Sequence, residues 1–148
     1  MYKHLLIPTD GSKLSDKAVK EGIALARQLG ARVTLYYAIP DFPEPVYLES
    51  AMMAPYVQPE EYRAEAERYA AKVLAKAAAR VSTAGLTPLT YSSLASVPWE
   101  GIVAAAAKKK CDLILMASHG RRGVSGFLLG SETQKVLTHS KVPVLVVR

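Results

Sequence analysis

Four of the nine glycines lie within eleven residues, between Gly120 and Gly130. Glycine lets backbone N–H groups approach an anion without a Cβ in the way, and Ser131, just beyond, carries a hydroxyl group. A helix that opened at Ser131 would add free N–H groups and a favourable dipole for phosphate. The same run is equally compatible with a surface turn that Ser131 caps. The segment therefore predicts either a phosphate site or a plain turn.

Asp10 and His119 are the other residues whose side chains could do chemistry. Asp10, in the run PTDGS, could act as a base, hold a metal or cap the following helix; we expect a ligand contact with a secondary capping role. His119 could contact a phosphate when protonated or serve as a structural residue. The sequence has no P-loop lysine, no Ser-His-Asp arrangement and no paired carboxylates beside the glycines. We assign no catalytic residue.

Metal ligation is not predicted either. Cys111 is the only cysteine, so an internal disulfide or a thiolate cluster is excluded and a packing role is expected. His4 and His139 do not have the spacing of metal ligands.

Composition indicates one globular domain spanning residues 1–148, with 50% hydrophobic and 22% charged residues. The net charge is +6, but basic residues cluster only at 108–110 and 121–122, so we do not expect a nucleic-acid partner. The apolar run near the N-terminus is shorter than a signal peptide or a membrane span needs. We therefore expect a cytoplasmic protein without a membrane partner.

Hydrophobic periodicity predicts alternating strands and helices. The expected strands are residues 2–8, 32–39, 86–94, 112–117 and 142–147, and the expected helices are 14–29, 60–84, 99–109 and 131–140. Residues 40–59 hold several prolines and are expected to form a long loop. This order predicts an α/β domain with a parallel sheet, in which ligands bind beyond the carboxyl ends of the strands where the strand order reverses. The apolar run 113–116 suits a central strand, and Pro143 suits an edge strand.

Specific motifs carry a family resemblance. Gly120, Gly130 and Ser131 match fixed positions of the pattern G-x-x-G-x9-G-[ST], which is typical of nucleotide-binding universal stress proteins. The runs IPTDGS, DLILM and VPVLVV also resemble the first, fourth and last strands of that family. The resemblance covers essentially the whole chain.

The resemblance implies a flavodoxin-like or Rossmann-like, doubly wound sheet of five parallel strands in the order 3-2-1-4-5, with helices on both faces. It also implies that ATP, or AMP or ADP, binds with Mg²⁺ held mainly by phosphates and water. Adenosine would face Pro8, Thr9 and Asp10, and adenine would meet the backbone of Ala38. The ribose and phosphates would be wrapped by Met116, Ala117, Ser118, His119, Gly120, Arg121 and Arg122, with further phosphate donors from Gly130, Ser131, Glu132 and Thr133.

One position departs from the family pattern: Ala117 stands where the motif has its first glycine. The added methyl group would abolish the site only if this position needed a left-handed backbone or a closer approach to the ligand.

The resemblance favours a regulator that binds adenine nucleotide in the stress response and is at most a weak ATPase. An interaction module of the same family without nucleotide stays the alternative. The run PTDGS argues against an adenylating enzyme, whose first loop commonly reads Ser-Gly-Gly. The resemblance also implies a homodimer, because the last strand of this family commonly pairs across a two-fold axis. The apolar edge from Val142 to Val147, with few charges to guard it, suits such pairing.

Overall fold

The structure, a computed structural model, describes residues 1–42, 58–120 and 129–148. Its elements are β1 (His4–Pro8), α1 (Lys13–Leu29), β2 (Arg32–Ile39), α2 (Pro59–Thr83), β3 (Pro88–Leu94), α3 (Pro98–Lys108), β4 (Leu113–Ala117), α4 (Ser131–His139) and β5 (Val144–Val147). Each predicted helix and strand is confirmed, with ends that differ by at most two residues. Most of the predicted long loop, residues 43–57, lies outside the described residues.

The five strands form one parallel sheet in the order β3-β2-β1-β4-β5, as predicted. Every residue of β4 is buried, in agreement with its apolar sequence and its position between β1 and β5. β5 lies at the edge, where Pro143 was expected to place it.

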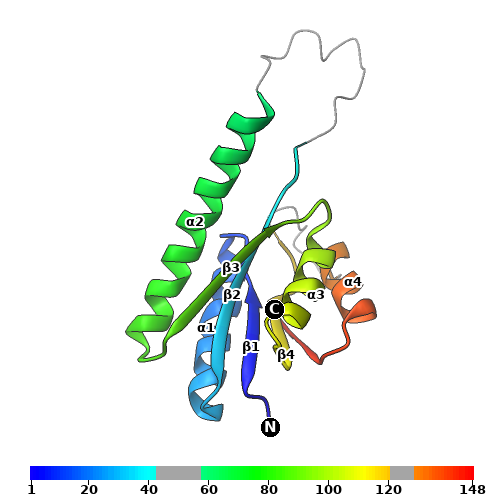
Figure 1. The fold of residues 1–148 in the computed structure, drawn as a ribbon. Helices are drawn as coiled ribbons and strands as arrows, with labels where there is room; N and C mark the ends of the chain where they lie inside the picture. The colour runs from blue at the N-terminus through cyan, green and yellow to red at the C-terminus, as the bar shows by residue number, and fades with distance from the viewer. Residues whose placement is uncertain (43–57, 121–128) are drawn as a thin grey trace.

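Helices cover both faces of the sheet (Figure 1). Leu5, Ile7 and Leu35 point into a core shared with α1 and α2, whereas Leu6 and Tyr36 point into a second core with α3 and α4. Adjacent strand residues thus face opposite layers, as a sheet covered on both faces requires.

The carboxyl ends of β1 and β4 form the point where the strand order reverses. The β1–β2 register continues to Pro8 opposite Tyr36, but the β1–β4 register covers only Leu5 with Leu113 and Leu6 with Ile114. Both strands continue past this pairing, so they separate toward their carboxyl ends. A parallel α/β sheet binds its ligands at such a point.

In the part of the chain that the structure describes, no helix combines the length and the apolar character that a bilayer crossing requires.

Candidate functional site

Residues 9–12, here called the β1 loop, leave the end of β1 in a fixed conformation. The Thr9 N–H donates to the Tyr36 carbonyl at 2.9 Å, and the buried Thr9 Oγ1 lies 3.1 Å from Ser15 Oγ. Gly11 has a φ of 80°, a left-handed conformation that glycine adopts without strain. The loop is therefore tied to both β2 and α1.

Asp10 lies in this loop but does not cap α1. The N-cap is Ser12, whose side-chain oxygen accepts the Ser15 N–H at 3.2 Å. Asp10 Oδ1 instead accepts the Ser12 N–H at 2.9 Å, because Asp10 precedes the cap by two residues and closes the turn before it. The predicted capping role was wrong in this respect, and the carboxylate stays at the end of β1.

The β1 loop meets the glycine-rich segment at Gly120. A Cβ built on Gly120 would lie 2.8 Å from Asp10 Oδ2, which is shorter than real Cβ contacts. Only glycine fits this approach without movement. Residues 110 positions apart are thus brought together at the point where the strand order reverses.

The two ends of the glycine-rich segment are joined to each other. Ser118 donates its N–H to the Val147 carbonyl at 2.8 Å, and its own carbonyl accepts the Gly130 N–H at 2.8 Å. The buried Thr133 hydroxyl donates to the Ala117 and Ser118 carbonyls, both at 3.1 Å. This hydroxyl hydrogen is committed to the fold, so the Thr133 side chain has no hydrogen left to donate to a ligand, in contrast to what the resemblance implied. Residues 121–128, with Arg121 and Arg122, lie outside the described residues.

The start of α4 presents backbone N–H groups that suit an anion. Its N-cap is Gly130, and no side chain among the described residues caps it. The first helical hydrogen bond runs from the Gln134 N–H to the Gly130 carbonyl at 3.0 Å, so the N–H groups of Ser131, Glu132 and Thr133 precede the helical ladder. These groups and the helix dipole favour negative charge.

Glu132 lies in the first turn of α4 but directs its carboxylate elsewhere. Oε2 accepts the Trp99 N–H in the first turn of α3 at 2.8 Å, and Oε1 lies 3.7 Å from Lys135 Nζ. The side chain therefore caps α3 while the Glu132 backbone stays at the α4 end. Sequence reasoning missed this role, because 33 positions separate the two partners.

His119 brings a buried ring nitrogen to the same segment. Its Nδ1 lies 2.8 Å from Ser118 Oγ, whereas its enclosed Nε2 has no hydrogen-bond partner among the described residues. Buried polar atoms normally have partners, and a ligand oxygen or hydroxyl would supply one for either tautomer.

The remaining predicted contacts come from strand backbones. The Tyr36 carbonyl faces β1 and the Ile39 carbonyl faces β3, so the alternation of peptide groups turns the backbone of Ala38 toward the β1 side, beyond the end of that strand. Pro8 is partly buried at the end of β1. The Met116 side chain packs in the α3/α4 core, so only its backbone is available to a ligand.

Ala117 does not need the conformational freedom of glycine. Among described non-glycine residues only Lys110 has a positive φ. Ala117 ends β4 in the sheet register, and its methyl group packs with Ala18 and Leu115 on the α1 side. The departure from the motif therefore causes no backbone strain here.

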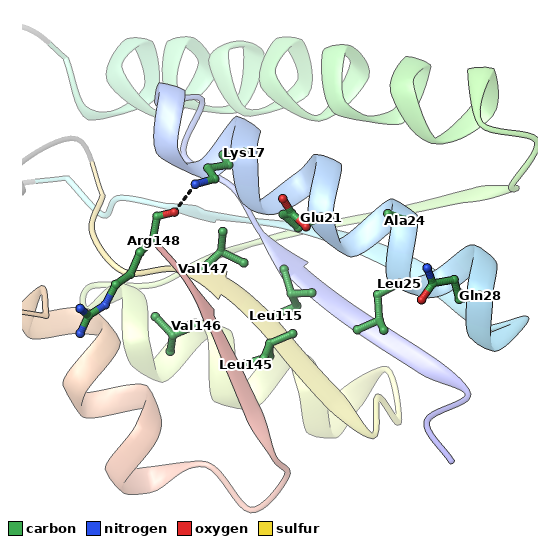
Figure 2. A pocket seen from close by; sticks show the side chains of 10 residues that line it. All are labelled: Lys17, Glu21, Ala24, Leu25, Gln28, Leu115, Leu145, Val146, Val147 and Arg148. Carbon is green, nitrogen blue, oxygen red and sulfur yellow. Dashed lines mark hydrogen bonds between the residues drawn. The ribbon is translucent and has the colours of Figure 1, made fainter.

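A separate groove of about 430 Å³ lies between α1 and β5, and no residue of the β1 loop lines it (Figure 2). Leu25, Leu115 and Leu145 contribute apolar surface, and the Lys17 ammonium donates to the Arg148 carbonyl at one end. Among described residues, no group of three or more acidic, cysteine or histidine side chains could hold a metal ion.

Comparison with known proteins agrees with this arrangement. The model of the universal stress protein family matches residues 1–148. The chain belongs to the universal stress protein family. A family member from Methanocaldococcus jannaschii is 33% identical over 148 residues, which are 100% of this chain and 83% of that protein.

Two solved structures of the family share its fold. The universal stress protein UspA from Lactobacillus plantarum has a TM-score of 0.82 at 22% identity and covers 99% of this chain and 98% of its own. A universal stress protein crystallised in complex with cAMP has a TM-score of 0.71 at 27% identity, and the match covers 99% of this chain and 97% of that protein.

Proposed function

We propose that this protein binds an adenine nucleotide (ATP, ADP or AMP) at the carboxyl ends of β1 and β4, as a regulator in the stress response. The observation that carries the proposal is the close approach of Asp10 to Gly120, beside the start of α4, which no side chain of the described residues caps. This arrangement brings the polar β1 loop, the backbone of Gly120 and the N–H groups at the start of α4 together at one end of the sheet. The family member crystallised with cAMP supports the choice of an adenine nucleotide.

The phosphates would lie against the N–H groups of Ser131, Glu132 and Thr133, with the Ser131 hydroxyl as a further donor. His119 Nε2 would gain a phosphate or ribose oxygen as its partner. Mg²⁺ would be held by phosphates and water, since magnesium retains several waters and the described residues offer no carboxylate cluster.

Adenosine would lie nearer β1 and β2. Asp10 would contact the ribose side, and the backbone of Ala38, directed past the end of β1, would offer a donor and an acceptor to adenine. Pro8 would contribute apolar contact. Backbone recognition of this kind reads the edge of the base without a dedicated side chain.

Isothermal titration with ATP and AMP tests the proposal, with Gly120→Ala as the site variant. We expect micromolar or tighter binding by the wild-type chain and at least about tenfold weaker binding by Gly120→Ala, because the new Cβ displaces Asp10. Gly30→Ala is the control: Gly30 has a φ of 63° and open space around it, so the variant loses stability but keeps its affinity. Absence of ATP and AMP binding by the folded wild-type protein would overturn the proposal.

Rapid catalysis is not part of this function. The described site holds two carboxylates: Asp10 accepts the Ser12 N–H, and Glu132 accepts the Trp99 N–H. Neither has an activated nucleophile beside it among the described residues. We expect ATP hydrolysis to be slow or absent; turnover at about ten per second or faster would contradict this view.

The regulator would act as a homodimer in which two copies pair along β5. β5 is an edge strand, and Leu145, 44% exposed, borders the groove beside it (Figure 2). An uncharged edge strand with apolar surface beside it suits pairing with a second copy.

A further inference from the structure

The β1 loop has a second neighbour, the long helix α2. A Cβ built on Gly11 would lie 3.1 Å from Val73 Cγ2 and 3.6 Å from the Tyr69 hydroxyl oxygen. α2 therefore packs directly against the residue that follows Asp10. Because Gly11 has no side chain, this part of the loop depends on its neighbours for its position.

The same tyrosine also contacts the end of β2. The rings of Tyr69 and Tyr37 pack edge to face with centroids 6.1 Å apart. Tyr37 is 4% exposed and immediately precedes Ala38. The Tyr69 side chain thus lies beside Gly11 of the β1 loop and packs on Tyr37, the residue before Ala38.

Tyr69 lies where α2 leaves the body of the protein. The buried residues of the helix begin at Ala70 and continue to Val81, and none of residues 59–69 is buried. The N-terminal half of α2 rises beyond the carboxyl ends of the strands (Figure 1). Tyr69 itself is 42% exposed, so a core role does not account for it.

We infer that Tyr69 is a positioning residue of the nucleotide site, which holds the Asp10–Gly11 turn at a fixed distance from the end of β2. The inference rests on the proposed function. The hydrogen bond from the Thr9 N–H to Tyr36 holds the start of the loop to β2 without the ring, but the Asp10–Gly11 turn then loses its α2 neighbour, and nucleotide binding must restore the position of this turn. A site that already has its bound arrangement loses no binding free energy to such a rearrangement.

The test compares two ligands and two tyrosines. ATP spans the site from Ala38 to α4, whereas tripolyphosphate reaches only the start of α4. Tyr69→Ala raises the Kd for ATP about fivefold or more and changes the Kd for tripolyphosphate less than about twofold. The matched control is Tyr62→Ala. Tyr62 lies seven residues earlier on α2, and its ring packs edge to face with that of Phe42, with the centroids 5.2 Å apart. We expect Tyr62→Ala to leave both Kd values unchanged.

A second variant separates the ring from general loosening. Tyr69→Phe keeps the ring against Tyr37 but removes the hydroxyl beside Gly11, so its Kd for ATP should lie between the values of the wild type and Tyr69→Ala. Equal effects of Tyr69→Ala and Tyr62→Ala on ATP would overturn the inference. A parallel loss of ATP and tripolyphosphate binding would do the same, since it reports unfolding or global loosening. Failure of the wild-type chain to bind ATP would instead overturn the proposed function.

Discussion

The methyl group of Ala117 packs in the core on the α1 side of the sheet, whereas α4 begins on the opposite side. Restoring the motif glycine therefore removes packing without opening space for a phosphate. We expect Ala117→Gly to lower the free energy of unfolding by about 1 kcal/mol and to leave nucleotide affinity unchanged, by urea denaturation and titration. Tenfold tighter binding by the glycine variant would show that the methyl group obstructs the ligand.

His4 lies at the other end of β1 and gives the protein a pH dependence. Burial lowers the pKa of His4 below 6.5; nearby Arg32 lowers this pKa further, and Asp112 opposes both. Below pH 6.5 the unfolded chain takes up a proton that the folded imidazole resists, so the free energy of unfolding falls. His4 Nε2 lies 2.8 Å from Thr34 Oγ1, a contact that a glutamine can replace.

We expect His4→Gln to reduce the loss of stability between pH 7 and pH 5, measured by urea denaturation at each pH. Asp112 accepts the backbone N–H groups of Lys3 and His4. Because the wild-type chain and the variant both retain Asp112, its titration contributes to the pH dependence of both. An unchanged pH dependence in the variant would exclude His4 as its source.

At the scale of elements, Glu132 links α4 to α3. Its carboxylate accepts the Trp99 N–H, so Glu132→Ala should lower the free energy of unfolding by about 1 kcal/mol, as the loss of a helix cap does. Trp99 is the only tryptophan, and its emission reports the change directly. Glu100→Ala, also in the first turn of α3, is the control and should lower the free energy of unfolding by only a few tenths of that amount. Equal losses of stability in the two variants would argue against a capping role of Glu132.

The elements were predictable because their signals are local. Gly30 ends α1 with a left-handed φ, Pro98 begins α3, and an apolar run forms β4. The strand order followed from the resemblance rather than from these signals. Contacts between distant residues, such as Glu132 with Trp99 and Tyr69 with Gly11, had no sequence signal, because neither side chain belongs to a motif.

For the candidate site, the sequence predicted which segments take part but not the contacts between individual residues. The motif indicated which segments should meet, and Gly120 beside Asp10 agrees with it. The binding roles of the individual residues remain predictions, and Arg121 and Arg122 lie outside the part of the chain that the structure describes. The commitment of the Thr133 hydroxyl to two carbonyls depends on the path of the chain between β4 and α4, which a spacing pattern does not specify.

At the scale of the whole molecule, the sheet has two edges that provide a matched pair of variants. Leu145 on β5 is 44% exposed, and Leu89 on β3 is 41% exposed. Sedimentation should give a dimer for the wild-type chain and for Leu89→Lys, and a monomer for Leu145→Lys, because a charge at a paired edge is unfavourable. A monomeric wild-type chain, or a dimer that only Leu89→Lys dissociates, would contradict pairing through β5.

A crystal structure with ATP would show directly where the nucleotide lies. We expect electron density at the carboxyl ends of β1 and β4, with adenine at the Ala38 backbone and phosphates at the N–H groups of Ser131 and Glu132. Crystals grown at saturating ATP with the nucleotide bound elsewhere, or with no density between Asp10 and the start of α4, would contradict this placement of the nucleotide.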